Sequence, residues 1–435
     1  MALGSNARIG WGFETVAAQQ KAATLYGLRF ASLMFNPDPV LSATRNMQSR
    51  PMQLKARLDR MNLPFSVDWD PSVDDLARII AHHQGYTAAP ALVATGVYDW
   101  VIRDLLSTDS LSSPISTLSI DADRDDGYAT LLLGAAINEM DFKVASNKIV
   151  QAKASGTACH FTHMLDSTMT TTGATYTGAL RIRGNRHDAD AEDTTNHLKV
   201  KCTTGGALDG TALVKCTKGA TAYGSATTAV TAGTWYRFDL ADGTNASGDP
   251  YNPVEFMLTT GGTLSVNDEF EIQAKRTAPT LTYPSRQPLH ANGLVVTIGG
   301  VQTVVDQFDI KAVRPRKEQR GCGSAYAQSH LPDGNRKFTI TIKRDYVTRA
   351  LYLKLLSANA VAFDATLLGD VIATVASVTY REKLQFISTN AQVFKAGADP
   401  TSEKQLDEGV TIMPYYDGTN VDMSAVVRCT LSTLT

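Results

Sequence analysis

The chain has 435 residues and a mass of 46.8 kDa, more than one ordinary hydrophobic core accommodates, so we expect two or three domains. Only 19% of the residues are charged and the formal net charge is -2, which excludes a basic surface that grips nucleic acid but not one that lets it pass. The sequence contains neither an apolar run of membrane-spanning length nor an apolar signal-peptide core at its start, so we expect no membrane span and no export by that route.

Cysteine usage points to a reducing compartment. The chain contains five cysteines, an odd number, widely spaced and without a C-x-x-C pair. This pattern favours free thiols in a cytoplasm over a disulfide framework. The cysteines are Cys159, Cys202, Cys216, Cys322 and Cys429.

Residues 1–65 are interrupted by prolines in FNPDPV, QSRPMQ and NLPF, at places that neither a helix nor a central strand tolerates. We therefore expect an irregular N-terminal arm. Because ordering such a long arm is entropically costly, we expect it to lie against a neighbouring subunit.

A short amphipathic helix is predicted after Asp70. Ser72 followed by Asp75 forms a capping-box pattern, and Gly85 is placed to end the helix. The apolar residues fall on one face at helical spacing: Val73, Leu76, Ala77 and Ile80.

The segment from 116 to 162 predicts a strand, an acidic turn, a Leu-rich stretch LLLGAAINEM, and two further strands, DFKVAS and KIVQAKASG. The turn, Asp121–Asp126, resembles the start of a calcium loop. However, the EF-hand positions that require glycine and glutamate hold Asp126 and Leu132. We therefore expect an acidic turn between strands and no calcium site.

Cys159, His160 and His163 come nearest to a zinc cluster, since they could supply three ligands. The sequence offers no fourth ligand at a suitable spacing, and on a strand His160 and His163 point to opposite faces. We expect no metal site and no cofactor.

Residues 172–277 are rich in Gly, Thr and Ala, and their short alternating strands include LKVKCT, VEFMLT and EFEIQA. Short strands at even spacing are typical of a small β-sandwich of about 100 residues, immunoglobulin-like or similar. The flanks TTTGATYTG and RTAPTLTYP indicate linkers, so we predict an insertion (172–277) between two parts of a host domain, 1–171 and 278–435.

The clearest hairpin is LVVTI-GG-VQTVVDQFDIKAV, in which Gly299 and Gly300 supply the positive φ angles of a two-residue turn. Its apolar candidates for a packed wall are Val296, Ile298, Val301 and Val304. A strand at 337–344, a helix at 345–359 capped by Asp345, and closing strands are predicted to follow.

The basic run between the hairpin and that strand predicts a solvated loop, or one that pairs with acidic residues of a neighbouring subunit. The basic candidates are Arg314, Arg316, Lys317 and Arg320, and their proposed partners in the acidic turn are Asp121, Asp123, Arg124, Asp125 and Asp126. The nucleophile elbow, the P-loop and the dinucleotide fingerprint are all absent from the sequence, so we do not expect an enzyme.

Four landmarks occur in an order that resembles the tail tube proteins of long-tailed bacteriophages (siphophages). They are the opening IGWGFETVAAQQKAATLYGLRF with its G-x-E, the helix DPSVDDLARIIAHHQG, the stretch LLLGAAINEMDFKVASNKIVQAKASG, and the late hairpin with its following strand and helix. Together they cover roughly three quarters of the chain. The insertion makes this chain unusually long for the family.

The resemblance implies a mainly β fold, a tail-tube sandwich or barrel with one or two short helices. Subunits of this family form hexameric rings that stack into a tube, each adding strands to an inner β-barrel with a helix packed outside. It further implies assembly in the host bacterial cytoplasm, residence in the virion tail, contacts with tape-measure, terminator and baseplate proteins, and transient passage of double-stranded DNA.

A different function class, a carbohydrate- or cell-binding virion adhesin, is the alternative. Trp235, Tyr236 and Tyr251 of the insertion could stack on sugars. A tryptophan in the context GTWYRF is, however, more often a core residue of a sandwich, which favours the first function class.

Overall fold

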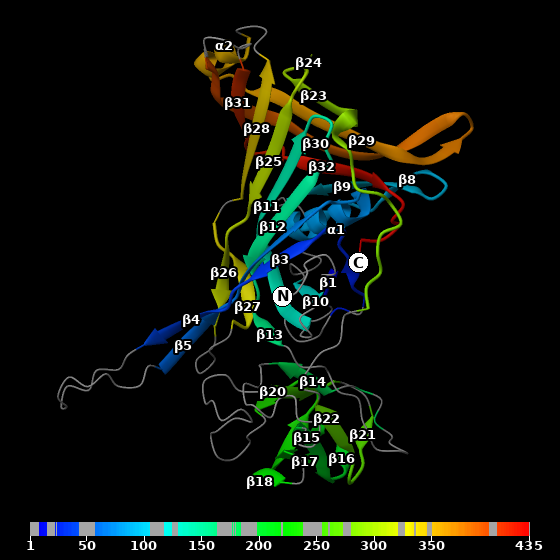
Figure 1. Ribbon diagram of the computed structural model, residues 1–435, viewed down its shortest axis with the longest axis vertical. Coiled ribbons are helices and arrows are strands. Elements are labelled where there is room, and N and C mark those ends of the chain that lie inside the picture. The colour runs from blue at the N-terminus through cyan, green and yellow to red at the C-terminus, as the bar shows by residue number, and fades with distance from the viewer. Residues whose placement is uncertain are drawn as a thin grey trace, which may run out of the picture.

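The computed structural model describes residues 8–14, 22, 24–42, 57–104, 117–123, 129–162, 176, 178, 180–183, 198–218, 221–237, 255–259, 262–272, 280–320, 327–334, 336–345, 350–399 and 407–434. These residues form a mainly β fold, as predicted, with two α-helices, α1 (Val73–Gln84) and α2 (Ala350–Ser357), and a 3₁₀ turn at Ala291–Gly293 (Figure 1).

The largest sheet has 19 strands drawn from both ends of the chain. The strands before residue 163 are β1 (Arg8–Phe13), β2 (Tyr26–Gly27), β3 (Ser32–Phe35), β6 (Pro64–Trp69), β7 (Tyr86–Thr87), β8 (Ala91–Ala94), β9 (Val97–Arg103), β10 (Leu118–Asp123), β11 (Ala129–Ala145), β12 (Gln151–Thr157) and β13 (His160–Thr162). The later strands are β23 (Leu294–Ile298), β24 (Val301–Thr303), β25 (Gln307–Val313), β28 (Lys337–Asp345), β29 (Val361–Val375), β30 (Val378–Asp399), β31 (Asp407–Pro414) and β32 (Ser424–Cys429).

Two long strands connect the parts of this sheet. The first half of β11 pairs with β10 and β13, and its second half lies between β12 and β25. Similarly, β30 lies between β29 and β32 over residues 383–387 and then pairs with β31 from residue 391 onward. Figure 1 shows β29, β32 and β9 running across the direction of β11, β25 and β28, so the sheet folds over itself and encloses one core.

Strand alternation places the core. In β25, Phe308, Ile310 and Ala312 are buried, and their neighbours point outward. The strands β12, β28 and β31 alternate in the same way. This part of the sheet therefore has an apolar inner face and a polar outer face, as expected for antiparallel strands with one solvated side.

The predicted helix is confirmed in its start, its cap and its end. The Ser72 hydroxyl accepts a hydrogen bond from the Asp75 backbone, the Asp75 carboxylate accepts one from Ser72, and Gly85 closes the helix with φ +88°. Every residue of α1 except Ala81 is buried, so its polar face is covered as well as its apolar face. The resemblance to tail tubes predicts only a helix packed on the outside of a barrel.

The prediction of an irregular stretch over residues 1–65 is wrong for the described part of it. Besides the strands above, β4 (Asp38–Ser42) and β5 (Arg57–Asn62) pair as a ribbon that projects from the main body (Figure 1). Pro39 lies in β4 and Pro64 is the first residue of β6, positions where a missing N–H is tolerated. Likewise, LLLGAAINEM and DFKVAS are one continuous strand, β11, with an irregularity near Ile137 rather than a break.

The strands between residues 180 and 272 pair only with one another and enclose a hydrophobic cluster of their own. They are β14 (Leu180–Arg183), β15 (Leu198–Thr204), β16 (Gly206–Ala207), β17 (Asp209–Lys218), β18 (Thr221–Thr231), β19 (Trp235–Arg237), β20 (Glu255–Leu258), β21 (Thr263–Leu264) and β22 (Glu269–Ile272). They form a three-stranded, a four-stranded and a two-stranded sheet. The predicted boundaries at 172 and 277 lie outside the described residues.

The late hairpin is confirmed: β23 and β24 pair around Gly299 and Gly300, whose φ angles are +59° and +81°. The strand predicted at 337–344 is β28. The predicted cap Asp345 is the last residue of β28, and residues 346–349 before α2 lie outside the described part. A separate ribbon, β26 (Arg316–Gln319) with β27 (Ser329–Pro332), precedes β28.

Candidate functional site

The acidic turn, predicted to pair with the basic run of a neighbouring subunit, differs from that prediction at its first residues. Asp121 and Asp123 belong to β10, and Asp121 lies opposite Gly10 of β1 and Leu131 of β11. Asp121 is fully buried, because β10 is covered on both faces, so the expectation that it stands in a solvent-facing turn is wrong. The remaining candidates of this turn, Arg124, Asp125 and Asp126, lie outside the described residues.

The basic run also differs from a solvated loop. Arg314 is buried, donates a hydrogen bond of 2.7 Å to the carbonyl of His83 at the end of α1, and lies 3.8 Å from the Asp104 carboxylate. Burial lowers the pKa of Arg314. This side chain therefore links the end of α1 to Asp104, the residue after β9, and is not available to a neighbouring subunit.

The other three basic candidates differ in exposure. Arg316 is half-buried, and burial together with the nearby Arg314 charge lowers its pKa to about 9. Arg320 forms an ion pair with Glu318 in the same segment. Of the four, only Lys317 is exposed, so it alone keeps the predicted position for an intersubunit contact.

The apolar residues of the late hairpin that were predicted to pack in a wall differ in burial between the two strands. Val296 and Ile298 of β23 are buried in the main core. Val301 and Val304, after the turn, are 67% and 87% exposed. The hairpin thus has one strand fixed in the core and a projecting apolar tip.

Cys159 has a partner that the sequence could not indicate. Its Sγ lies 3.3 Å from Nε2 of His330, a residue 171 positions later in β27. The same Nε2 donates to the Gly134 carbonyl at 3.0 Å, and burial lowers the pKa of His330, so the ring is neutral at pH 7. The described residues contain no group of three or more side chains able to hold a metal ion, and His163 is not among them.

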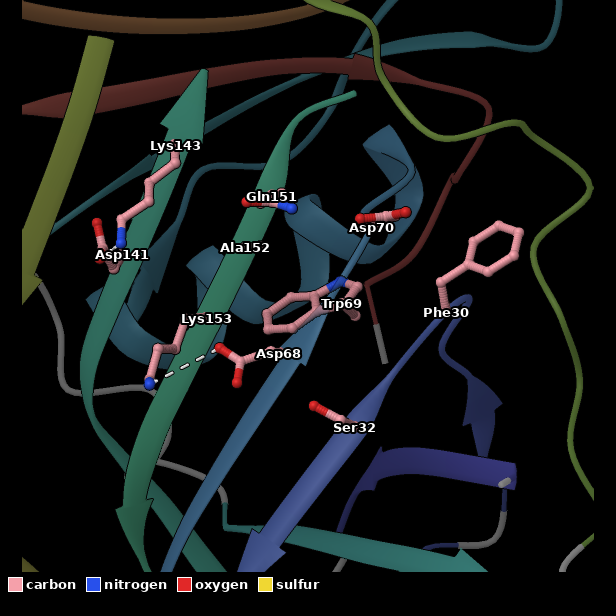
Figure 2. A pocket seen from close by; sticks show the side chains of 10 residues that line it. All are labelled: Phe30, Ser32, Asp68, Trp69, Asp70, Asp141, Lys143, Gln151, Ala152 and Lys153. Atoms are coloured by element: carbon pink, nitrogen blue, oxygen red, sulfur yellow. Dashed lines mark ion pairs between the residues drawn. The ribbon is translucent and has the colours of Figure 1, made fainter. Parts of the chain in front are cut away.

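The outer face of the sheet around β3, β6, β12 and β11 carries a depression with a volume of about 330 Å³ (Figure 2). Four of its five charged side chains form two pairs of opposite charge, and the fifth is Asp70. Lys153 lies 3.8 Å from Asp68 on the neighbouring strand, and Lys143 lies 3.3 Å from Asp141 on the same strand. Figure 2 shows these side chains on one face, with Phe30 at the margin.

The pairing of charges continues across this outer face, which we call the polar wall (the outward side chains of β6, β12, β11, β25 and β28). On the next strand, Lys311 of β25 lies 2.8 Å from Glu139 of β11. Exposed pairs of this kind add little stability, but they keep the surface hydrated and nearly neutral. Such a face can neither concentrate an anion strongly nor bury an apolar ligand.

Glu14, the last residue of the G-x-E landmark, connects three strands. Its buried carboxylate accepts hydrogen bonds from the Thr117 hydroxyl at 2.5 Å, the Ser119 hydroxyl at 3.1 Å and the Gly134 backbone N–H at 2.7 Å. Gly134, the centre of LLLGAA, has φ +64°, a conformation that favours glycine. Two landmarks that are distant in the sequence are therefore joined by one carboxylate.

Large apolar side chains are exposed at the margins of the main body. They occur on the projecting β29–β30 hairpin (Leu368, Val371, Val375, Val378), on α2 (Tyr352, Leu353, Leu356), on the β24 tip (Val301, Val304) and on β8 (Leu92). Figure 1 shows the β29–β30 hairpin extending well beyond the rest of the sheet. These apolar side chains on projecting elements are available for contact with a partner.

Comparison with models of known protein families and with curated proteins found no match to this chain. Within the described residues, neither helix is long and apolar enough to cross a membrane.

Proposed function

We propose that this chain is a structural virion protein whose copies form hexameric rings that stack into the tail tube of a long-tailed phage. The polar wall is the observation that carries the proposal. A broad antiparallel sheet with one face on the core and the other hydrated and charge-paired is suited to line a conduit. DNA could pass such a surface without the counterion release that holds it on basic surfaces.

The apolar margins support assembly. A closed ring buries side chains and strand edges that a single subunit leaves exposed, which is how β proteins avoid uncontrolled pairing. In this proposal the β29–β30 hairpin, α2 and the β24 tip contact neighbouring copies.

The insertion would decorate the exterior of the tube, because its strands close on a core of their own and add nothing to the main sheet. The further partners are those of a tail: a tape-measure protein, terminator and baseplate proteins, and DNA in transit. Assembly would take place in the cytoplasm of the host bacterium. The chain is not proposed to be an enzyme or to bind a cofactor.

Negative-stain electron microscopy of the purified chain tests the proposal. We expect rings or striated tubes of uniform diameter at concentrations where unrelated β proteins remain dispersed. Leu353→Asp on α2 should abolish them, and Ser357→Asp, an exposed position of the same helix, should not. Wild-type protein that stays monomeric under all assembly conditions would overturn the proposal.

The aromatic side chains of the insertion give the adhesin alternative less support than the polar wall gives the tail tube. The Tyr236 hydroxyl accepts a hydrogen bond from the Thr231 backbone, and its ring packs 5.8 Å from that of Phe256 in the insertion core. Trp235 is half-buried, and Tyr251 lies outside the described residues. Saturable binding to a glycan surface by an unassembled chain would favour the adhesin.

A further inference from the structure

The β29–β30 hairpin has a buried carboxylate at its root. Alternation along β30 directs Glu382 to the same side as Leu384 and Phe386, and Glu382 is only 2% exposed. It lies under Gly369 of β29, where a Cβ atom would come within 2.6 Å of the Glu382 Oε2. Here the register of β29 and β30 shifts, so the carboxylate occupies the place where the free part of the arm (residues 368–381) begins.

The Arg286 guanidinium adds a contact between this root and the rest of the chain, beside the pairing of β30 with β32. Arg286, from the segment that leads back from the insertion, places its Nε 3.6 Å from Glu382 Oε1 and donates from Nη1 to the Val371 carbonyl at 3.4 Å. The Asp370 backbone N–H donates to Glu382 Oε2, also at 3.4 Å. These contacts are long, and within the described residues Oε1 receives no hydrogen bond. The charge of Glu382 is therefore poorly stabilised.

A second buried carboxylate, that of Asp74, also interacts with the charge of Arg286. Asp74, in the first turn of α1, is 5% exposed, and the charges of Arg78 and Arg286 both act on it. The carboxylates of Asp370 and Asp74 repel that of Glu382. Arg78, on the same helix as Asp74, stacks on the Tyr26 ring of β2 at 3.6 Å. Cys429 of β32, whose thiol pKa is raised to about 12 by burial, is neutral and compensates neither carboxylate.

We propose that Glu382, placed between Arg286 and the repelling carboxylate of Asp74, is a proton-controlled latch: while Glu382 is protonated the arm root is closed, and when it ionises the arm loosens. Burial, opposed by Arg286, raises the pKa of Glu382 to about 7, and burial also raises that of Asp74. A carboxyl whose pKa is higher in the closed state than in the open state stabilises the closed state. This stabilisation is complete below the open-state pKa and is lost as the pH rises through the closed-state pKa. The closed state therefore loses this stabilisation between about pH 4.5 and 7. The latch belongs to the single chain and does not depend on assembly.

Hydrogen exchange of arm peptides in the full-length chain, corrected for the intrinsic pH dependence of exchange, tests the latch. In the wild type the protection factor should fall on the order of tenfold per pH unit between pH 5 and 7 and level off above that. In Glu382→Gln, which cannot ionise, it should be flat. Glu139→Gln, the same substitution on the polar wall, should behave as the wild type.

A second variant keeps the test decisive if Glu382→Gln fails to fold. Asp74→Asn removes one repelling charge, so the fall in protection should end at a lower pH than in the wild type. A wild-type profile that is flat from pH 5 to 8 overturns the latch. So does an Asp74→Asn profile identical to a falling wild-type profile.

Discussion

At the scale of single residues, Glu14, which directly follows β1, contributes to holding that strand on the sheet. Three donors from two other strands converge on its carboxylate, and the amide nitrogen of Glu14 itself donates to the Thr117 carbonyl. Charge-assisted hydrogen bonds of this kind are about twice as strong as neutral ones. These bonds reinforce the pairing of β1 with β10 through one buried side chain.

We expect Glu14→Gln to lower the free energy of unfolding by about 2–4 kcal/mol, because the amide has one acceptor oxygen in place of two and turns an N–H₂ group toward donors. Urea titration followed by circular dichroism measures the loss. Glu139→Gln, whose carboxylate pairs with Lys311 at the surface, should change stability by less than about 0.5 kcal/mol. Equal losses in the two variants would contradict the role of Glu14.

The turn glycine Gly300 offers a second test at this scale. Its φ is +81°, and among the described residues no atom lies within 4 Å of the place that an added methyl group would take. Gly300→Ala therefore meets backbone strain alone, and we expect a loss of about 1 kcal/mol. Gly409→Ala, equally unobstructed but without a positive φ, should be neutral in the same thermal unfolding experiment.

At the scale of elements, the sequence predicts local structure well where neighbouring residues determine it. The cap of α1, its end at Gly85 and the Gly299-Gly300 turn each depend on residues a few positions apart, and all three are confirmed. The burial of Asp121 and the pairing of Cys159 with His330 depend on strands that are distant in the sequence. No local pattern carries that information, so neither could be predicted.

The prolines before residue 65 were a misleading signal because the effect of a proline depends on strand partners that are distant in the sequence. A proline excludes a central strand, but an edge or a first strand residue accepts it. Whether Pro39 and Pro64 occupy such places depends on which strands pair with β4 and β6, and these partners are known only from the fold.

The arm leads to a prediction about assembly. Val378 of β30 is 52% exposed, and Thr379, also exposed, points to the opposite face. Val378→Asp should prevent ring or tube formation in sedimentation and electron microscopy while leaving the thermal unfolding of the monomer unchanged, because the position lies outside the core. Thr379→Asp should assemble normally. Assembly by both variants would exclude this face of the arm from the interface.

At the scale of the whole molecule, the two hydrophobic clusters predict two unfolding events. Because the strands from β14 to β22 pair only among themselves, replacing residues 174–276 by a short Gly/Ser linker should remove one calorimetric transition and leave the other within a few degrees. The shortened chain should still form tubes. Loss of both transitions would show that the main body needs the insertion in order to fold.

The pairing of β9 with β32 has a consequence for synthesis of the chain. Arg103 lies opposite Ser424, so β9 cannot complete its pairing until the segment around Ser424 has left the ribosome. At bacterial and eukaryotic elongation rates of about 5–20 residues per second, this delay is roughly 15 to 60 s. During this time the early strands present unpaired edges, and the insertion, which needs only its own residues, is able to fold first. Nascent chains of this protein are therefore natural clients for a chaperone that shields strand edges until the last segment arrives.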